Sequence, residues 1–269
     1  SPGAAAWAVA RTARDLAPSL GEAGELGAFA RRAWLIAAEA AAAGGAVDDA
    51  EARAAAVADG AVRGNDVLAA MRARFVLGQT AGARGEHPLA LERLAAASRL
   101  AADLRNDYYQ GRIAHARGVH LLALGEYSAA ELRLAEAVAL LARTENFVHR
   151  AGAQVSLGSL LCEFGRFDEA VDLLSQAELR DASIAAGPDP RASRLAIAKA
   201  LLGLGRYEEA VARLEGLLEL ERTLGSRSGE LDTLGLLARA ELGRGNAPAA
   251  ERAAAAAVQV ANADGSPDS

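Results

Sequence analysis

The sequence predicts an all-α protein, and three observations carry this prediction. The chain is rich in alanine and leucine, which are strong helix formers, and 52% of its residues are hydrophobic. Only 4% of the residues are aromatic, and the residues that strands prefer are scarce. Six glycines recur every 40 residues, and each is followed five residues later by an alanine. The repeat therefore predicts helix hairpins stacked along the chain. These glycines are Gly45, Gly85, Gly125, Gly165, Gly205 and Gly245.

The repeat at residues 111–150 shows how one hairpin is expected to form. A helical segment runs to about Leu124, and Gly125 supplies a residue that can take the turn without a Cβ penalty. A second helix is expected to begin near Tyr127. Each repeat is therefore expected to hold two antiparallel helices.

The spacing of small and apolar residues predicts how the two helices pack. Ala130, Leu134 and Ala137 fall on one face of the second helix, and Gly118 with Leu121 forms the matching stripe on the first. Small residues at these crossing points allow helices to approach closely. The other small residues at crossing points are Gly158 and Ala198 in first helices, and Ala170 and Ala210 in second helices. The aromatic residue two positions after the turn glycine, as in Tyr127, Phe167 and Tyr207, is expected to fill the remaining gap.

The chain divides into a short beginning and six repeats. Residues 1–30 are expected to form a partial repeat or cap helix at 5–17, followed after Pro18 by a connector containing Gly21, Gly24 and Gly27. Six repeats follow at 31–70, 71–110, 111–150, 151–190, 191–230 and 231–269. Loops are expected near Gly64, Asn106, Thr144 to Asn146, Gly187 to Pro190, Gly225 and Gly265. A start in mid-repeat suggests a segment of a longer polypeptide, and the alternative is a complete small protein with a degenerate cap.

Three consecutive segments resemble tetratricopeptide (TPR) repeats. They are LALGEYSAAELRLAEAV, CEFGRFDEAVDLLSQAE and LGLGRYEEAVARLEGLL, which share the turn glycine, the aromatic residue after it and the alanines five and twelve positions after it. The resemblance covers residues 31–269 and implies a right-handed superhelical α-solenoid. The common TPR has about 34 residues, so this 40-residue repeat implies longer helices. It resembles the sensor arms of bacterial maltose-activator and LuxR-type regulators, and spindle-orientation adaptors.

Composition disfavours several classes of function. The net charge is -6, from 35 acidic and 29 basic residues, and neither sign forms a long run, so direct nucleic-acid binding is not expected. Cys162 is the single cysteine and has no disulfide partner in the chain. No window has the roughly 20 continuous apolar residues that span a membrane, so we expect no membrane insertion and a cytoplasmic location.

The motifs of common enzyme classes are missing from the sequence. It contains no phosphate loop, no HExxH, no CxxC and no GxSxG motif. His115 and His120 are five residues apart and cannot share a metal on one helix face, and Cys162 has no evident base. We therefore expect no enzyme activity, no cofactor and no metal.

Function is then expected on the surface of the repeat array. In such arrays the first helices line the concave groove, and counting along each first helix defines a stripe that is not used for packing. Cationic and aromatic side chains on this stripe predict an acidic or anionic ligand, because arginine holds carboxylates through paired hydrogen bonds. The alternative is that Arg72 and Arg112 neutralise acids of adjacent repeats and that Phe75 fills a gap between helices. The predicted groove residues are Arg72, Phe75, Gln79, Tyr108, Arg112, His115, Ser159, Lys199 and Arg239.

Three functions remain open at the level of the sequence. The first is a non-enzymatic module that binds a peptide or protein partner in the groove. The second is the effector-sensing arm of a multidomain transcriptional regulator. The third is a self-assembling scaffold, such as a homodimer, because the ends of repeat arrays expose apolar surface.

Overall fold

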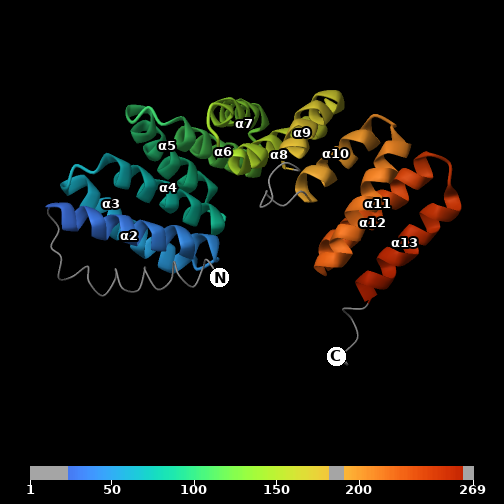
Figure 1. Cartoon of the computed structure of the whole chain (residues 1–269), viewed down its shortest axis with the longest axis horizontal. Helices are drawn as coiled ribbons and strands as arrows, with labels where there is room; N and C mark the ends of the chain where they lie inside the picture. The colour runs from blue at the N-terminus through green and yellow to red at the C-terminus, as the bar shows by residue number, and fades with distance from the viewer. Residues whose placement is uncertain (1–23, 182–190, 263–269) are drawn as a thin grey trace. The chain divides into compact units, whose positions relative to one another are not determined.

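The computed structural model describes residues 24–181 and 191–262, and this part of the chain contains twelve helices and no strands (Figure 1). The expected helix at 5–17 and the loops expected near Gly187 to Pro190 and Gly265 lie outside the described residues. The all-α prediction is confirmed for the part described. No described helix is both long enough and apolar enough to cross a lipid bilayer.

The helices alternate as first and second members of hairpins. The first helices are α2 (Gly24–Ala43), α4 (Val67–Ala83), α6 (Asp107–Ala123), α8 (Phe147–Glu163), α10 (Arg191–Gly203) and α12 (Arg227–Gly243). The second helices are α3 (Val47–Arg63), α5 (His87–Asp103), α7 (Tyr127–Ala142), α9 (Phe167–Asp181), α11 (Tyr207–Leu224) and α13 (Ala247–Asn262). Helix α2 begins at Gly24, so Gly24 and Gly27 are helical and do not belong to a connector.

The six repeating glycines make the turns inside the hairpins. All six have positive φ angles, between 70° and 84°, which only glycine adopts at little cost. At Gly125 the backbone N–H donates to the Leu122 carbonyl, and the next N–H, of Glu126, donates to the Leu121 carbonyl. The turn therefore satisfies carbonyl groups that the end of α6 leaves open.

Polar caps start two of the first helices. The Asp66 side chain accepts a hydrogen bond from the Ala69 N–H at the start of α4, and the Asn106 side chain accepts one from the Tyr109 N–H at the start of α6. Such caps satisfy backbone donors that a helix cannot pair within itself. The loop expected near Asn106 is thus confirmed.

Close approach of the helices explains the small residues of the repeat. A Cβ atom added at Gly118 would lie 2.7 Å from Leu134 Cδ2, and one added at Gly158 would lie 2.6 Å from Leu174 Cγ. Ala130, Leu134 and Ala137 are fully buried, as their spacing predicts. The core therefore lies between the layer of first helices and the layer of second helices, with each leucine filling the space above a glycine.

The aromatic residue after the turn glycine packs on the next hairpin. The ring of Phe167 covers Gly203, and the ring of Tyr207 covers Gly243, so closely that neither glycine has room for a Cβ atom. In an earlier repeat His87 takes this place, and its Nδ1 lies 3.3 Å from Nδ1 of His120 on α6. The expected role of the aromatic residue as a gap filler is confirmed at Phe167 and Tyr207, whereas Tyr127 is 51% exposed.

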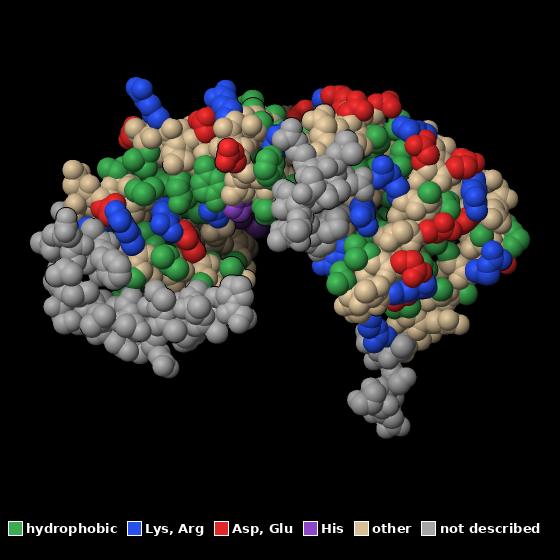
Figure 2. Space-filling view, in the orientation of Figure 1, with side chains coloured by type: hydrophobic (Ala, Val, Ile, Leu, Met, Phe, Trp, Pro, Cys, Tyr) green, Lys and Arg blue, Asp and Glu red, His purple; other side chains and the backbone are tan. Residues whose placement is uncertain are grey.

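The chain forms two compact units, 1–146 and 147–269. In the first unit α2 to α7 pack in chain order, and the first helix α4 also contacts the first helices α2 and α6. In the second unit α8 to α13 pack in the same way, with contacts among α8, α10 and α12. Acidic and basic side chains are interspersed on the visible face of each unit (Figure 2).

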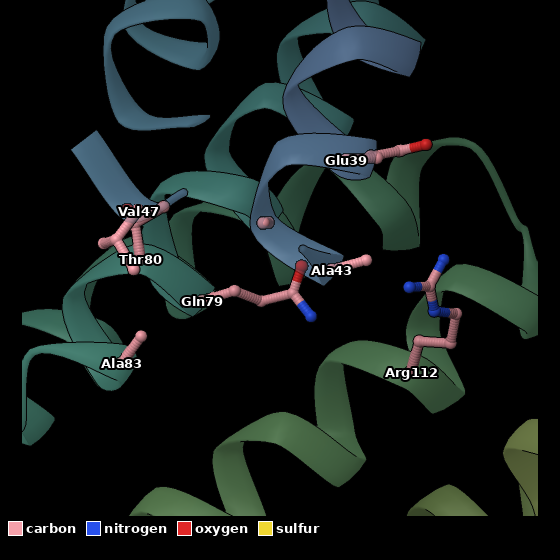
Figure 3. A pocket seen from close by; sticks show the side chains of 8 residues that line it. Glu39, Ala43, Val47, Gln79, Thr80, Ala83 and Arg112 are labelled. Atoms are coloured by element: carbon pink, nitrogen blue, oxygen red, sulfur yellow. The ribbon is translucent and has the colours of Figure 1, made fainter. Parts of the chain in front are cut away.

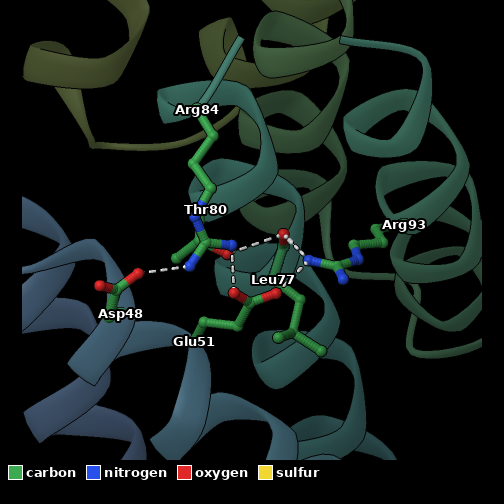
Figure 4. Close-up of polar contacts among 6 residues, drawn as sticks. All are labelled: Asp48, Glu51, Leu77, Thr80, Arg84 and Arg93. Carbon is green, nitrogen blue, oxygen red and sulfur yellow. Dashed lines mark hydrogen bonds and ion pairs between the residues drawn. The ribbon is translucent and has the colours of Figure 1, made fainter. Parts of the chain in front are cut away.

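A cluster of charges joins three helices of the first unit (Figure 4). Arg84, the C-cap residue of α4, donates to Glu51 and, over 2.6 Å, to Asp48 of α3. Arg93 of α5 donates to Glu51 over 2.9 Å and to the Leu77 carbonyl over 3.0 Å. The hydrogen bonds from Arg84 and Arg93 lower the pKa of Glu51 below its ordinary value. Glu51 therefore stays ionised and links the second helices of adjacent hairpins.

Candidate functional site

The predicted groove residues fall into two sets, one in each unit. Arg72, Phe75 and Gln79 lie on α4, and Tyr108, Arg112 and His115 lie on α6, which contacts α4 directly. Ser159, Lys199 and Arg239 lie on α8, α10 and α12 of the second unit.

Arg72 is neutralised within the chain. Its Nε donates to Glu39 Oε1 over 3.0 Å, and its Nη2 donates to Glu39 Oε2 over 2.8 Å. This paired geometry joins α4 to α2 and is the strongest form of arginine–carboxylate contact. For Arg72, the structure therefore shows the alternative that the sequence left open, in which the arginine balances an acid of the adjacent repeat.

Phe75 does not lie on the exposed stripe where we expected it. Its side chain is only 3% exposed and belongs to a core cluster with Met71, Leu94 and Ile113. The guanidinium of Arg112 lies over the ring, 4.8 Å from its centroid. Phe75 is therefore a core residue whose ring packs against the Arg112 guanidinium.

Arg112 is held by aromatic groups. Its guanidinium carbon lies 5.5 Å from the Tyr108 ring centroid, and its Nη1 donates to the Tyr108 hydroxyl over 3.3 Å. Tyr108 in turn meets Tyr109 edge to face, with centroids 5.1 Å apart. Within the described ranges 24–181 and 191–262, no carboxylate forms an ion pair with Arg112. Its positive charge is therefore oriented by stacking and left unbalanced.

A pocket of about 210 Å³ opens beside Arg112 (Figure 3). We call it the Arg112 pocket. The Gln79 side chain extends into it from α4, Arg112 borders it from α6, and Glu39 borders it from α2. The pocket thus combines an arginine, an amide and an already paired carboxylate with small apolar walls. Its lining residues are Glu39, Ala42, Ala43, Val47, Gln79, Thr80, Ala83 and Arg112.

His115 lies on α6, one turn beyond Arg112 along the chain. Burial lowers the pKa of its imidazole below the ordinary value of 6.5. At neutral pH the side chain is therefore mostly uncharged and adds no positive charge to this face.

The second unit carries a separate set of predicted groove residues, two of which are cationic. Ser159, Lys199 and Arg239 occupy the same place in three successive repeats, and all three side chains are exposed. No ion pair involves Lys199 or Arg239 among residues 147–181 and 191–262. This face of the second unit can therefore attract negative charge.

The residues that line the Arg112 pocket were only partly predicted. Gln79 and Arg112 were predicted, whereas Glu39 and Thr80 were not. The sequence contains a signal for Glu39, since it lies 40 residues before Gln79 and so holds the same place in the preceding repeat. Extending the count of the stripe to the repeat at 31–70 would have identified it.

Two features of the described residues concern metal and thiol chemistry. No group of three or more histidine, cysteine, aspartate or glutamate side chains within them could hold a metal ion. Burial raises the pKa of the Cys162 thiol, which works against a reactive thiolate at neutral pH. The Arg112 pocket offers a guanidinium and an amide to a polar group.

Comparisons with known proteins agree with this fold. No protein-family model matches the sequence, and no curated protein matches it. A putative kinesin light chain of Podosopora anserina with nearly identical TPR-like repeats is 25% identical, with a TM-score of 0.60, and the match covers 74% of this chain and 97% of that one.

Two further solved structures share the fold at lower identity. A signal transduction ATPase with numerous domains from Pyrococcus horikoshii, which has a tetratricopeptide repeat sensor, gives a TM-score of 0.74 at 12% identity, over 93% of this chain and 38% of that one. A Rap protein complexed with competence and sporulation factor gives 0.61 at 18% identity, over 86% and 63%. The described part of the chain thus has the helical repeat fold of TPR-like proteins, as its sequence predicts.

Proposed function

We propose that the chain is a non-enzymatic module that binds a carboxylate-bearing segment of a peptide or protein on the face of α2, α4 and α6. One observation carries this proposal. Arg112 borders an open pocket, is oriented by Phe75 and Tyr108, and has no carboxylate partner in the described part of the chain.

The physical chemistry of this face suits peptide binding. A stacked arginine is already ordered, so a ligand that pairs with it loses less conformational entropy on binding. Tyr108 adds flat apolar area beside the cation, as in the anchor regions of many protein interfaces. The likeness to the Rap protein, which was solved with competence and sporulation factor, supports a binding role for such a fold.

The second unit supports the same class of ligand independently. Lys199 and Arg239 expose two cations on the first helices α10 and α12. We propose that this face also favours acidic segments, through weaker and more salt-sensitive contacts, because both cations are exposed to solvent.

A peptide selection tests the proposal. Random peptides displayed on phage are selected on the wild-type protein, and the enriched peptides are then measured against Arg112→Glu and Arg99→Glu. Arg99 is an exposed arginine on the second helix α5, so its reversal changes the net charge equally but off the proposed face.

We expect the selected peptides to be rich in aspartate and glutamate. We also expect Arg112→Glu to weaken them at least about tenfold while Arg99→Glu changes affinity only about twofold. Selection of peptides without acidic residues, or equal effects of the two reversals, would contradict the proposal.

A second candidate is the effector-sensing arm of a larger regulator. It is favoured by the TM-score of 0.74 to the signal transduction ATPase that has a repeat sensor, although this likeness concerns the fold. Determining the gene sequence on both sides of this segment tests it. An adjoining ATPase or helix-turn-helix region would support this role, and a reading frame limited to the repeats would exclude it.

A further inference from the structure

Arg72 holds the position in the preceding repeat that corresponds to Arg112, and the structure shows which residue Arg72 pairs with. Arg72 pairs with Glu39, which lies 33 residues earlier in the chain. Moving this pair forward by one 40-residue repeat gives Arg112 and Gln79, again 33 residues apart. Both members of the second pair line the same pocket. The two sites are therefore built on the same scaffold, and they differ in that an amide replaces the carboxylate.

The surroundings of the two arginines differ in a consistent way. Where Arg112 has Phe75 and Tyr108, the preceding repeat has Leu35 and Leu68 at the corresponding positions. Arg112 is thus oriented by two aromatic faces, whereas Arg72 is oriented by the Glu39 carboxylate.

Gln79 makes no hydrogen bond to another described residue, so its amide can still donate to a ligand.

We propose that Arg112 and Gln79 form a subsite for one carboxylate group of the bound peptide, which takes the place that the Glu39 carboxylate holds in the preceding repeat. This inference rests on the proposed function, and it names the chemical group that the site takes. Arg112 would donate through its guanidinium and Gln79 through its amide nitrogen. Glu39 also borders the pocket, but Arg72 balances its charge, so repulsion of an incoming carboxylate is reduced.

The substitution Gln79→Glu tests the subsite because it supplies the carboxylate from within the chain. The new side chain stands where Glu39 stands one repeat earlier, so it is expected to pair with Arg112. The fold should be kept, with an unchanged or higher melting temperature, while the subsite becomes filled. Binding of a carboxylate ligand should then fall at least about tenfold.

Val119→Glu is the matched control for this change. Val119 holds the same place in the next repeat and is 40% exposed, but the residue 33 positions after it is Gly152. The control therefore adds the same charge to α6 without an arginine at the corresponding position. We expect it to reduce binding no more than about twofold, through general repulsion.

Fluorescence anisotropy at low ionic strength measures binding of three labelled probes. They are N-acetyl hexaglutamate with an amidated end, N-acetyl hexaglutamine with an amidated end, and N-acetyl hexaglutamine with a free terminal carboxylate. Binding of the first probe identifies a side-chain carboxylate as the ligand, and binding of the third identifies a chain end. The second probe carries no carboxylate and should not bind.

The outcomes separate this inference from the proposed function. Loss of binding in Gln79→Glu but not in Val119→Glu supports the subsite. Equal loss in both variants overturns the subsite and leaves the general attraction of acidic segments in place. If neither carboxylate probe binds the wild type, the subsite is also overturned, and the phage selection then decides the proposed function separately.

The reverse substitution, Glu39→Gln, provides an independent readout. It frees Arg72 and should create a second carboxylate site of the same kind, with a higher capacity for the hexaglutamate probe. An unchanged capacity in a folded Glu39→Gln variant would contradict the equivalence of the two sites.

Discussion

Two histidines, His115 and His120, make the stability of the first unit depend on pH. Burial, together with the neighbouring His87, lowers the pKa of His120 below 6.5, and burial lowers the pKa of His115. The unfolded chain therefore takes up protons at a higher pH than the folded chain, and stability is lost as the pH falls through 6.5 toward the folded-state pKa values. Stability should be fully present above this range.

We predict that the free energy of unfolding falls between about pH 7.5 and pH 5.5, before carboxylates begin to titrate. Urea denaturation at several pH values measures this slope. His120→Gln should make the slope shallower, and His115→Gln should reduce it further. A slope that is unchanged in both variants would show that other groups control this pH range.

The contacts of individual side chains were the least predictable feature of the molecule. The spacing predicted Gln79 and Arg112 on one stripe, and both line the same pocket, but the spacing did not distinguish Arg112 from Arg72. That difference lies in the side chain at the corresponding place of the preceding hairpin, which is the carboxylate of Glu39 for Arg72 and the neutral amide of Gln79 for Arg112. Phe75 was expected to be exposed, but it is buried, and the Arg112 guanidinium lies over its ring. Contacts of this kind depend on packing between repeats, which helix periodicity does not report.

At the scale of the helices, the glycines that permit close packing should tolerate no side chain. Gly118→Ala would place a methyl group 2.7 Å from Leu134, which fills the core between α6 and α7. We predict a loss of roughly 1–3 kcal/mol in unfolding free energy, because the leucine must move out of a closely packed position. Urea denaturation measures the change.

Gly216→Ala is the control for this prediction. Gly216 lies within α11 and is exposed, and a methyl group added there would meet no atom within 4 Å beyond the adjoining backbone of its own helix. The same chemical change should stabilise the protein by roughly 0.5–1 kcal/mol, because alanine loses less backbone entropy in a helix. If both substitutions destabilise equally, close helix contact is not the reason for Gly118.

The helices were the most predictable part of the molecule. The 40-residue period located the turn glycines, and all six have the positive φ that only glycine adopts readily. The start of α2 at Gly24 was missed, because the cluster of Gly21, Gly24 and Gly27 is typical of a connector. The low helix propensity of these glycines is outweighed by packing, because the residues that follow them form a buried helix face with Leu35 at its centre.

On the scale of the whole molecule, stability arises from contacts between neighbours. Within each of the two units, a hairpin buries its apolar face against the neighbouring hairpins of the same unit, as in other repeat proteins. Within the second unit α11 packs on both α10 and α12, whereas α13 packs on α12 among the described helices. Only Ala250 and Ala253 of α13 are buried.

We predict that backbone amides of α13 exchange hydrogen faster than those of α11. A helix that is packed on one side opens locally at a lower free energy than one packed on both sides. Hydrogen–deuterium exchange followed by mass spectrometry on the full chain compares the two helices. Equal protection would show that α13 is stabilised by contacts beyond those with α12.

The exchange of Glu39 for Gln79 between successive repeats has an evolutionary consequence. Codons for glutamate and glutamine differ by a single base, so one point mutation converts an arginine–carboxylate pair into an arginine–amide pair of the kind that we propose binds a carboxylate, or the reverse. In a repeat array each copy can make this change while the glycines and leucines that hold the hairpins together stay as they are. Ligand preference can therefore diverge one repeat at a time, without any redesign of the scaffold.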